Sequence, residues 1–167
     1  LPNHEKSLEK SMIIGKRKIG QEHPTYIVAE AGINHNGSLK LAKELVDAAV
    51  EAGAHAVKFQ KRDLLSLYPE DMLNHPEKYE QSFQYIIPLL KKFELSNNDY
   101  LELRRYAEDK PIDFICTPFD IPSAQLIYNA GIAAFKVASA DLTNYPLLEY
   151  VASKDLPIII STGMAYR

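Results

Sequence analysis

The sequence predicts an α/β fold with a parallel sheet, because short apolar runs alternate with amphipathic helices along the chain. The runs are apolar at consecutive positions, which is typical of strands that are covered on both faces. Helical segments separate most successive runs, so neighbouring strands are expected to be parallel. The five expected strands are 26–30, 56–59, 113–116, 134–137 and 158–160.

The helices between these strands have recognisable beginnings and ends. Apolar residues recur at helical spacing over 39–52, and Gly53 follows that segment. A helix over 121–130 has Pro122 near its start and Gly131 just after its end. A helix over 145–153 follows Asn144, which is placed to cap it.

One longer insert separates the second and third strands. Residues 61–111 carry a loop and two further helices, near 79–93 and 97–109. The second of these begins after Ser96 in a capping-box pattern.

The N-terminal part of the chain precedes this alternation. Residues 1–10 are a polar leader. Two short apolar stretches, 12–14 and 26–28, surround Gly15, Gly20 and Pro24, which predicts a β-hairpin or a capping strand.

Two architectures fit five such strands. An open five-stranded flavodoxin-like sheet needs a final helix over its last strand, and the sequence supplies none. A (β/α)₈ barrel has ~250 residues and eight strands. We therefore expect the N-terminal portion of a (β/α)₈ TIM barrel over 11–167, with the remaining barrel strands absent from this chain.

Composition excludes several classes of protein. The 167 residues have a net charge of −3 and no basic stripe, so nucleic acid is not an expected partner. No apolar stretch approaches the ~20 residues of a membrane span. A single cysteine, Cys116, excludes a disulfide framework and fits a cytoplasmic protein. Since Cys116 lies in an apolar run, we expect a small core residue there.

Polar side chains gather where the expected strands end, which is where parallel α/β folds build their sites. Lys58 and Lys136 lie within strands, although lysine is depleted from strands and costly to bury unpaired. The two cations, with hydroxyls beside them, indicate a site for a phosphate or carboxylate. Either lysine could instead form a structural ion pair with Glu30 or Asp141. Lys136 could also act as the Schiff-base nucleophile of an aldolase. His35, in a loop rich in Gly and Asn, is expected to form loop hydrogen bonds rather than to bind a metal.

Five sequence motifs resemble the sialic acid synthase family, the bacterial nonulosonate synthases. They are Ile27–Gly37 (IVAEAGINHNG), Val57–Gln60 (VKFQ), Cys116–Asp120 (CTPFD), Phe135–Asp141 (FKVASAD) and Ile160–Ala165 (ISTGMA). The resemblance covers roughly 12–167. It implies a transferase that condenses phosphoenolpyruvate with an open-chain N-acylated hexosamine, such as N-acetylmannosamine, and releases phosphate.

The resemblance also implies roles for individual residues. Residues that match the phosphoenolpyruvate pocket are Thr117, Lys136, Ser139 and Ser161, with Lys58 as a second cation. Glu30 and Gln60 match positions near the sugar and the reacting carbons, and Asn34 is expected to bind substrate. Asp141 stands where synthases that use N-acetylmannosamine place a Glu. Glu30, Lys136 and Asp141 are therefore the expected catalytic residues. The shorter Asp141 leaves room for a different sugar, and a related product such as legionaminate stays open.

Further expectations concern parts that this chain lacks. The resemblance implies a divalent metal, Mn²⁺ or Mg²⁺, whose two histidine ligands lie beyond Arg167, so no metal ligand is expected here. It implies a C-terminal antifreeze-like domain and a homodimer. Two other functions stay open: a Kdo- or DAHP-type phosphoenolpyruvate aldol transferase, and an inactive barrel half with a binding role.

Overall fold

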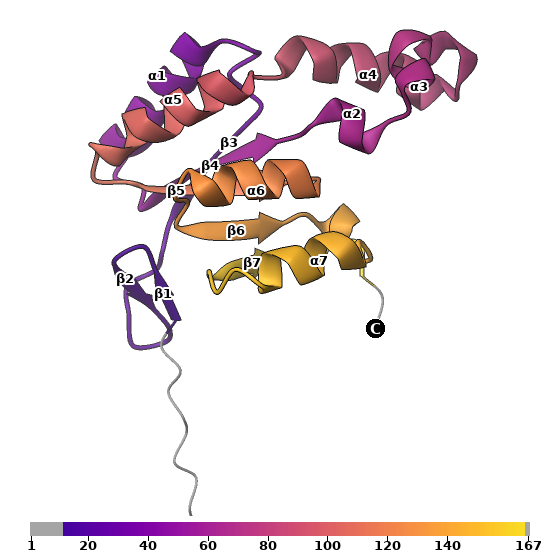
Figure 1. Cartoon of the computed structure of the whole chain (residues 1–167). Coiled ribbons are helices and arrows are strands. Elements are labelled where there is room, and N and C mark those ends of the chain that lie inside the picture. The colour runs from indigo at the N-terminus through magenta and orange to yellow at the C-terminus, as the bar shows by residue number, and fades with distance from the viewer. Residues whose placement is uncertain (1–11, 166–167) are drawn as a thin grey trace, which may run out of the picture.

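The computed structural model describes residues 12–165 and contains a sheet of five parallel strands in sequential order (Figure 1). The strands match the predicted positions, but three of them extend two residues further toward their carboxyl ends, and the first begins at Val28 rather than at 26. They are β3 (Val28–Gly32), β4 (Ala56–Lys61), β5 (Asp113–Pro118), β6 (Ala134–Val137) and β7 (Ile158–Ile160).

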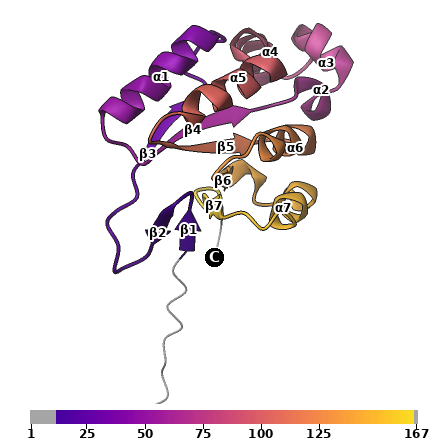
Figure 2. The ribbon, with the colours of Figure 1, turned by 60° about the vertical axis from the view of Figure 1, so that its left-hand side comes forward.

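Four helices cover one face of this sheet (Figures 1 and 2). They are α1 (Leu39–Glu51), α5 (Asn97–Glu108), α6 (Ile121–Asn129) and α7 (Tyr145–Ala152). Each begins after a residue whose side-chain oxygen accepts a backbone N–H: Ser38, Ser96, Asp120 and Asn144. The predicted helices and the Asn144 cap are confirmed.

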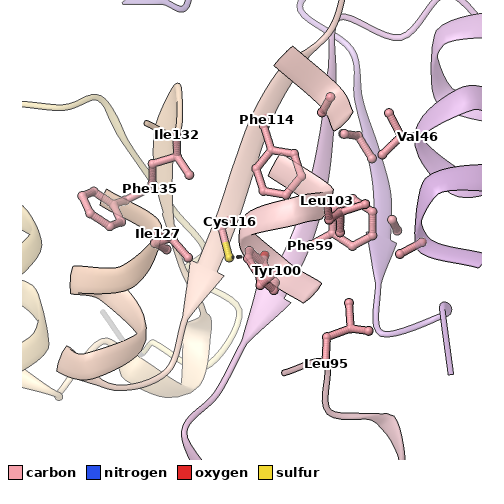
Figure 3. Packing of buried hydrophobic residues seen from close by; sticks show 14 of the residues in the cluster. Val46, Phe59, Leu95, Tyr100, Leu103, Phe114, Cys116, Ile127, Ile132 and Phe135 are labelled. Atoms are coloured by element: carbon pink, nitrogen blue, oxygen red, sulfur yellow. Dashed lines mark hydrogen bonds between the residues drawn. The ribbon is translucent and has the colours of Figure 1, made fainter. Parts of the chain in front are cut away.

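The core under these helices is aromatic at its centre. Phe59 and Phe114 stack with their ring centroids 5.4 Å apart, and Tyr100 of α5 meets Phe114 edge-on. Cys116 lies beside them and is fully buried, with the Tyr100 hydroxyl 2.8 Å from its sulfur (Figure 3). Burial raises the pKa of the Cys116 thiol to about 12. Cys116 is therefore the inert core residue that the sequence predicts.

The opposite face of the sheet carries a second apolar cluster at the amino ends of the strands. It consists of Ala56, Ile115 and Ala134, packed with Ile14 from a hairpin below. The hairpin pairs β1 (Met12–Ile14) with β2 (Arg17–Ile19) in antiparallel register. The hairpin is confirmed, but 26–28 is not its second strand. Gly15 adopts a φ of 58°, which permits the tight reversal, so the chain turns back after three residues.

The strand order separates the two predicted architectures. A doubly wound sheet reverses its strand order and carries helices on both faces. Here each strand pairs with its sequence neighbour, and the four long helices that pack on the sheet lie on one face. The flavodoxin-like alternative is therefore wrong, and the arrangement is that of consecutive strands in a (β/α)₈ barrel wall.

The insert after β4 contains more helix than the sequence predicts. The predicted helices correspond to α4 (Gln81–Phe93) and α5. Three short elements precede them: α2 (Leu64–Leu67), α3 (Glu70–Asn74) and η1 (Pro76–Lys78). These were missed because elements of three to five residues are too short to show helical periodicity. Leu64 of α2 and Leu73 of α3 pack onto Ile87 and Leu90 of α4.

Two expectations concern the ends of the chain and the membrane. The predicted leader, 1–10, lies outside the described residues. Within 12–165, no helix has the length and apolar character needed to cross a bilayer.

Candidate functional site

A layer of polar side chains lies above the apolar cluster on the inner face of the sheet. Side chains alternate between the two faces of a strand. In β4, Val57 and Phe59 face the helices, so Ala56, Lys58 and Gln60 face inward. The same alternation turns other polar residues inward, next to Lys58. We call this set the polar layer: Glu30, Lys58, Thr117 and Lys136.

Three members of the polar layer are in direct contact across three strands. Lys58 Nζ lies 2.8 Å from Glu30 Oε2 and donates a hydrogen bond of 3.0 Å to Thr117 Oγ1. Lys58 is 8% exposed and Thr117 is 2% exposed. The side chain of Glu30 remains 57% exposed. The predicted alternative of a Lys58–Glu30 ion pair is therefore present, with one oxygen of Thr117 completing it.

Lys136 has no such carboxylate partner among residues 12–165. Its Nζ donates to the carbonyl of Val137 instead. Burial lowers the pKa of Lys136, and the nearby charge of Lys58 lowers it further, while Glu30 partly offsets both effects. The polar layer thus holds two ammonium groups and one carboxylate, which only Lys58 contacts, and this excess of positive charge favours the binding of an anion.

Gln60 and Gly32 lie next to the polar layer on the inner face. A methyl group added at Gly32 would lie 3.2 Å from Oε1 of Glu30 and 3.6 Å from Nε2 of Gln60. The absence of a side chain at Gly32 therefore keeps open the space that Glu30 and Gln60 border. The structure brings these two predicted residues together.

The segment after β6 carries two more predicted residues on a short helical turn, η2 (Ser139–Asp141). Oδ1 of Asp141 accepts a hydrogen bond of 3.2 Å from the side chain of Asn144. Oδ2 of Asp141 is buried and has no partner among the described residues. Ser139 lies beside Gly163, and the backbone N–H of Ser161 donates to Val137. The loops after β6 and β7 therefore adjoin.

Asn34 and His35 occupy the loop after β3. Asn34 is exposed and makes no side-chain hydrogen bond to a described residue. His35 is buried, and its Nδ1 accepts the backbone N–H of Gly37. This confirms His35 as a loop hydrogen-bonder, and burial lowers its pKa. The structure does not bring Asn34 into contact with the polar layer.

Among residues 12–165, no cluster of three or more His, Cys, Asp or Glu side chains could hold an ion. The described residues thus do not by themselves fit the divalent metal that the resemblance implies.

Arg62 is a feature that the sequence analysis did not select. It follows β4 directly, and its guanidinium carbon lies 3.6 Å from the centroid of the Phe119 ring. The sequence does indicate Arg62, because Lys58, Gln60 and Arg62 are spaced by two, as are side chains on one face of an extended chain. It was missed because the predicted strand stops before Arg62.

Chemically, the polar layer combines two cations, a hydroxyl and an exposed carboxylate on one face of the sheet. The cations and the hydroxyl can hold a phosphate or a carboxylate. The exposed carboxylate can accept or return a proton beside it. This combination suits a reaction of a small anionic substrate.

Comparison with known proteins identifies the family to which this chain is similar. The family model described as the NeuB family matches residues 45–167. The N,N'-diacetyllegionaminic acid synthase of Legionella pneumophila is 44% identical over 156 residues, which cover 91% of this chain and 43% of that protein. The human N-acetylneuraminate-9-phosphate synthase is 37% identical over 149 residues, or 89% of this chain and 42% of that protein.

Solved structures agree with the sequence relatives. The N-acetylneuraminic acid (sialic acid) synthetase of Leptospira borgpetersenii matches with a TM-score of 0.78 and 35% identity, over 93% of this chain and 50% of that one. A truncated 3-deoxy-D-arabino-heptulosonate 7-phosphate synthase from Thermotoga maritima matches with a TM-score of 0.62 at 12% identity, which supports the barrel fold alone. This chain spans half or less of the length of each relative cited here. The predicted resemblance is confirmed, and the chain belongs to the NeuB family.

Proposed function

We propose that this chain forms the phosphoenolpyruvate-binding part of an enzyme that condenses phosphoenolpyruvate with an open-chain N-acylated hexosamine. The product is a nonulosonic acid, and phosphate is released. The observation that carries the proposal is the polar layer, in which Lys58 forms an ion pair with Glu30 while Lys136, on the same face, pairs with no carboxylate of residues 12–165. The relatives named as legionaminic and neuraminic acid synthases support the reaction class.

The proposed reaction balances as follows. Carbon 3 of phosphoenolpyruvate forms a bond to the aldehyde carbon of the sugar, and the aldehyde oxygen takes up a proton. Water adds to carbon 2, and the bond between carbon 2 and the bridging oxygen breaks to release phosphate. The resulting 2-keto acid contains all the sugar carbons and three carbons from phosphoenolpyruvate.

Each residue of the polar layer has a proposed part in these steps. Lys58 and Lys136 hold the anionic groups of phosphoenolpyruvate, and Thr117 orients Lys58 through the 3.0 Å hydrogen bond. Glu30 and Asp141 are the two carboxylates available for proton transfer. Ser139 and Ser161 lie at the ends of the neighbouring strands and would add hydroxyl donors to the phosphate.

Gln60 and Asn34 are proposed to contact the sugar. Gln60 borders the same space as Glu30, which supports its part. Asn34 rests on the resemblance alone. We also propose a divalent metal, Mn²⁺ or Mg²⁺, and a homodimer, with metal ligands outside this chain. Neither enters the steps above.

The test is a phosphate-release assay on the protein as it is naturally encoded, with Mn²⁺ or Mg²⁺ supplied. N-acetylmannosamine, its 6-phosphate and arabinose 5-phosphate are offered with phosphoenolpyruvate, and products are identified by mass. We expect phosphate release only when phosphoenolpyruvate and an N-acylated hexosamine are both present, with a product equal to the hexosamine plus pyruvate. Turnover of arabinose 5-phosphate alone would indicate the Kdo-type alternative, and turnover of no sugar would contradict the proposal.

A further inference from the structure

A hollow lies at the amino ends of the strands, at the opposite end of the sheet from the polar layer. It is bordered by the turn of the β1–β2 hairpin, which lies below the sheet in Figure 2, by the segment from α5 to β5, and by the turn from α6 to β6. Its volume is about 620 Å³, within the ~300–1,000 Å³ typical of small-molecule sites. We call it the basal hollow, and its basic lining residues are Lys16, Arg17, His55, Arg104 and Lys110. It shares no lining residue with the polar layer.

The lining of the basal hollow is basic, although the chain as a whole has a net charge of −3. Its acidic lining residues are Glu108 and Asp113. A smaller hollow of about 270 Å³ shares Arg17 and His55 with it and has no acidic lining residue. Lysine and arginine therefore outnumber aspartate and glutamate among the residues that line the two hollows, which favours an anionic ligand.

The two acidic side chains offset only part of this positive charge. Oδ2 of Asp113 accepts a hydrogen bond of 2.8 Å from the Tyr26 hydroxyl, and its Oδ1 lies against Gly15 of the hairpin turn. This carboxylate therefore holds Tyr26 and the hairpin at the sheet. Glu108 is exposed near the end of α5, where water screens its charge.

Three of the cations have no ion-pair partner among residues 12–165. They are Lys16 and Arg17 on the hairpin and Arg104 on α5. Lys110, by contrast, lies with its Nζ 2.7 Å from Oδ1 of Asp47. The hollow is thus lined from two walls by cations that are free to bind a ligand.

Two partly buried donors of the basal hollow are held in place by backbone contacts. Nε of Arg104 donates a hydrogen bond of 2.8 Å to the carbonyl of Gly131, which leaves its two Nη groups without a described partner. Nδ1 of His55 accepts the backbone N–H of Ile27 at 2.9 Å, so a neutral His55 carries its proton on Nε2. A fixed guanidinium and a fixed imidazole N–H therefore add hydrogen-bond donors to the charge of the lining.

We propose that the basal hollow binds a small molecule that carries a diphosphate, with Arg104 and His55 as fixed donors and Lys16 and Arg17 contributed by the hairpin. Guanidinium and ammonium groups form strong hydrogen bonds with phosphate oxygens. A single carboxylate would neutralise one cation, whereas a diphosphate carries enough charge for the cations of both walls. The bound ligand would also tie the hairpin to the end of α5. This inference goes beyond the proposed function and does not rest on it.

The probe is inorganic pyrophosphate, added without metal to the naturally encoded protein and followed by calorimetry. We expect a binding event that Arg17→Gln and Arg104→Gln each weaken by about 10-fold or more, since each removes a charged donor. Raised salt should weaken it as well. Lys136→Met alters the polar layer at the other end of the sheet and should leave this event unchanged.

Arg105 provides a matched control, because it follows Arg104 on α5 but is exposed and does not line the basal hollow. Arg105→Gln should bind pyrophosphate as the wild type does. Arg104→Gln also loses the hydrogen bond to Gly131, so thermal unfolding without pyrophosphate checks its fold. Arg17→Gln removes no hydrogen bond to a described residue, so its effect reports the charge alone.

Hydrogen exchange then locates the bound probe. Pyrophosphate is expected to slow amide exchange in peptides that cover 12–19 and 130–135. Protection confined to the loops after β6 and β7, or binding that only Lys136→Met abolishes, would place the anion in the polar layer and overturn the proposal. An absence of binding, or tighter binding of citrate than of pyrophosphate, would also overturn it. None of these outcomes depends on phosphate release from phosphoenolpyruvate, so the proposed function stands or fails separately.

Discussion

The ammonium of Lys58 lies 2.8 Å from the carboxylate of Glu30, although the two residues come from neighbouring strands at the carboxyl end of the sheet. The two ends of this pair differ in exposure, since Lys58 is buried and the Glu30 side chain is 57% exposed. Glu30 can therefore leave the pair and turn toward a substrate, whereas Lys58 is fixed by Thr117. This asymmetry underlies the first prediction.

Glu30→Gln is predicted to separate turnover from binding. It removes the proton-transfer group, so kcat should fall by about 10²-fold or more. It also removes a negative charge beside phosphoenolpyruvate, so KM for that substrate should stay equal or fall. Steady-state kinetics measure both constants. Glu44→Gln, at an exposed ion pair with Lys40, is the control and should change neither. A raised KM with unchanged kcat would assign Glu30 to substrate binding.

Lys136→Met is predicted to stabilise the free protein while weakening its binding of phosphoenolpyruvate. Burial, reinforced by Lys58, lowers the pKa of Lys136, so the folded state disfavours its charged form. Removing the amine therefore raises the free energy of unfolding at pH 7. Denaturant unfolding with and without phosphoenolpyruvate measures both effects, with the exposed Lys40→Met as control. A destabilised Lys136→Met protein would show that Lys136 is structural.

The lowered pKa of Lys136 also predicts that the free energy of unfolding depends on pH. A lysine whose pKa is lowered by folding reduces stability below that folded-state pKa. The free wild type should gain stability as the pH rises from the lowered pKa of Lys136 toward the ordinary lysine value, and Lys136→Met should lack that gain. The affinity for phosphoenolpyruvate should fall over the same range, because the amine loses its proton. Affinity that stays constant over that range would contradict a role for the Lys136 charge.

Cys116 is predicted to be unreactive in the folded protein. Its thiol is fully buried, has a pKa of about 12 and contacts the Tyr100 hydroxyl (Figure 3). A thiol reagent at pH 8 should label it only after denaturant unfolds the chain, as intact mass will show. Rapid labelling of native protein would mean that the core between α5 and β5 opens readily.

Gly15→Ala is predicted to loosen the hairpin below the barrel wall. A methyl group there would lie 2.1 Å from Oδ1 of Asp113, and the φ of 58° adds strain. Gly53 has a similar φ of 72° with no atom within 4 Å, so Gly53→Ala isolates the strain alone. Thermal unfolding should show a loss of about 1 kcal/mol for Gly53→Ala and on the order of 2–3 kcal/mol for Gly15→Ala. Equal losses would show that contact with Asp113 does not matter.

The parallel strands and long helices were predictable from the sequence because local signals coincide there. Apolar runs mark β5 and β6, and cap residues such as Ser96 and Asn144 mark helix starts. The second hairpin strand was not predictable in this way. Arg17–Ile19 has one partly buried apolar residue, and its pairing depends on the positive φ of Gly15, which only the folded chain reveals.

The sequence was enough to predict which residues form the site. The motifs and strand ends located Glu30, Lys58, Thr117 and Lys136, and the structure places them on one face. The contacts among them were not predictable, because they depend on strand register and depth. Arg62 was missed because it lies beyond the end of the predicted strand, although its spacing from Lys58 and Gln60 was visible; its stack on the Phe119 ring depends on the fold.

The most direct test of the central claim follows the bridging oxygen of phosphoenolpyruvate. The substrate is labelled with ¹⁸O at that position and incubated with the naturally encoded protein, an N-acylated hexosamine and Mn²⁺ or Mg²⁺. Condensation as proposed breaks the bond from carbon 2 to the bridging oxygen, so the account predicts that the released phosphate carries the label. Unlabelled phosphate, or phosphate released without a carbon–carbon bonded product, would contradict it.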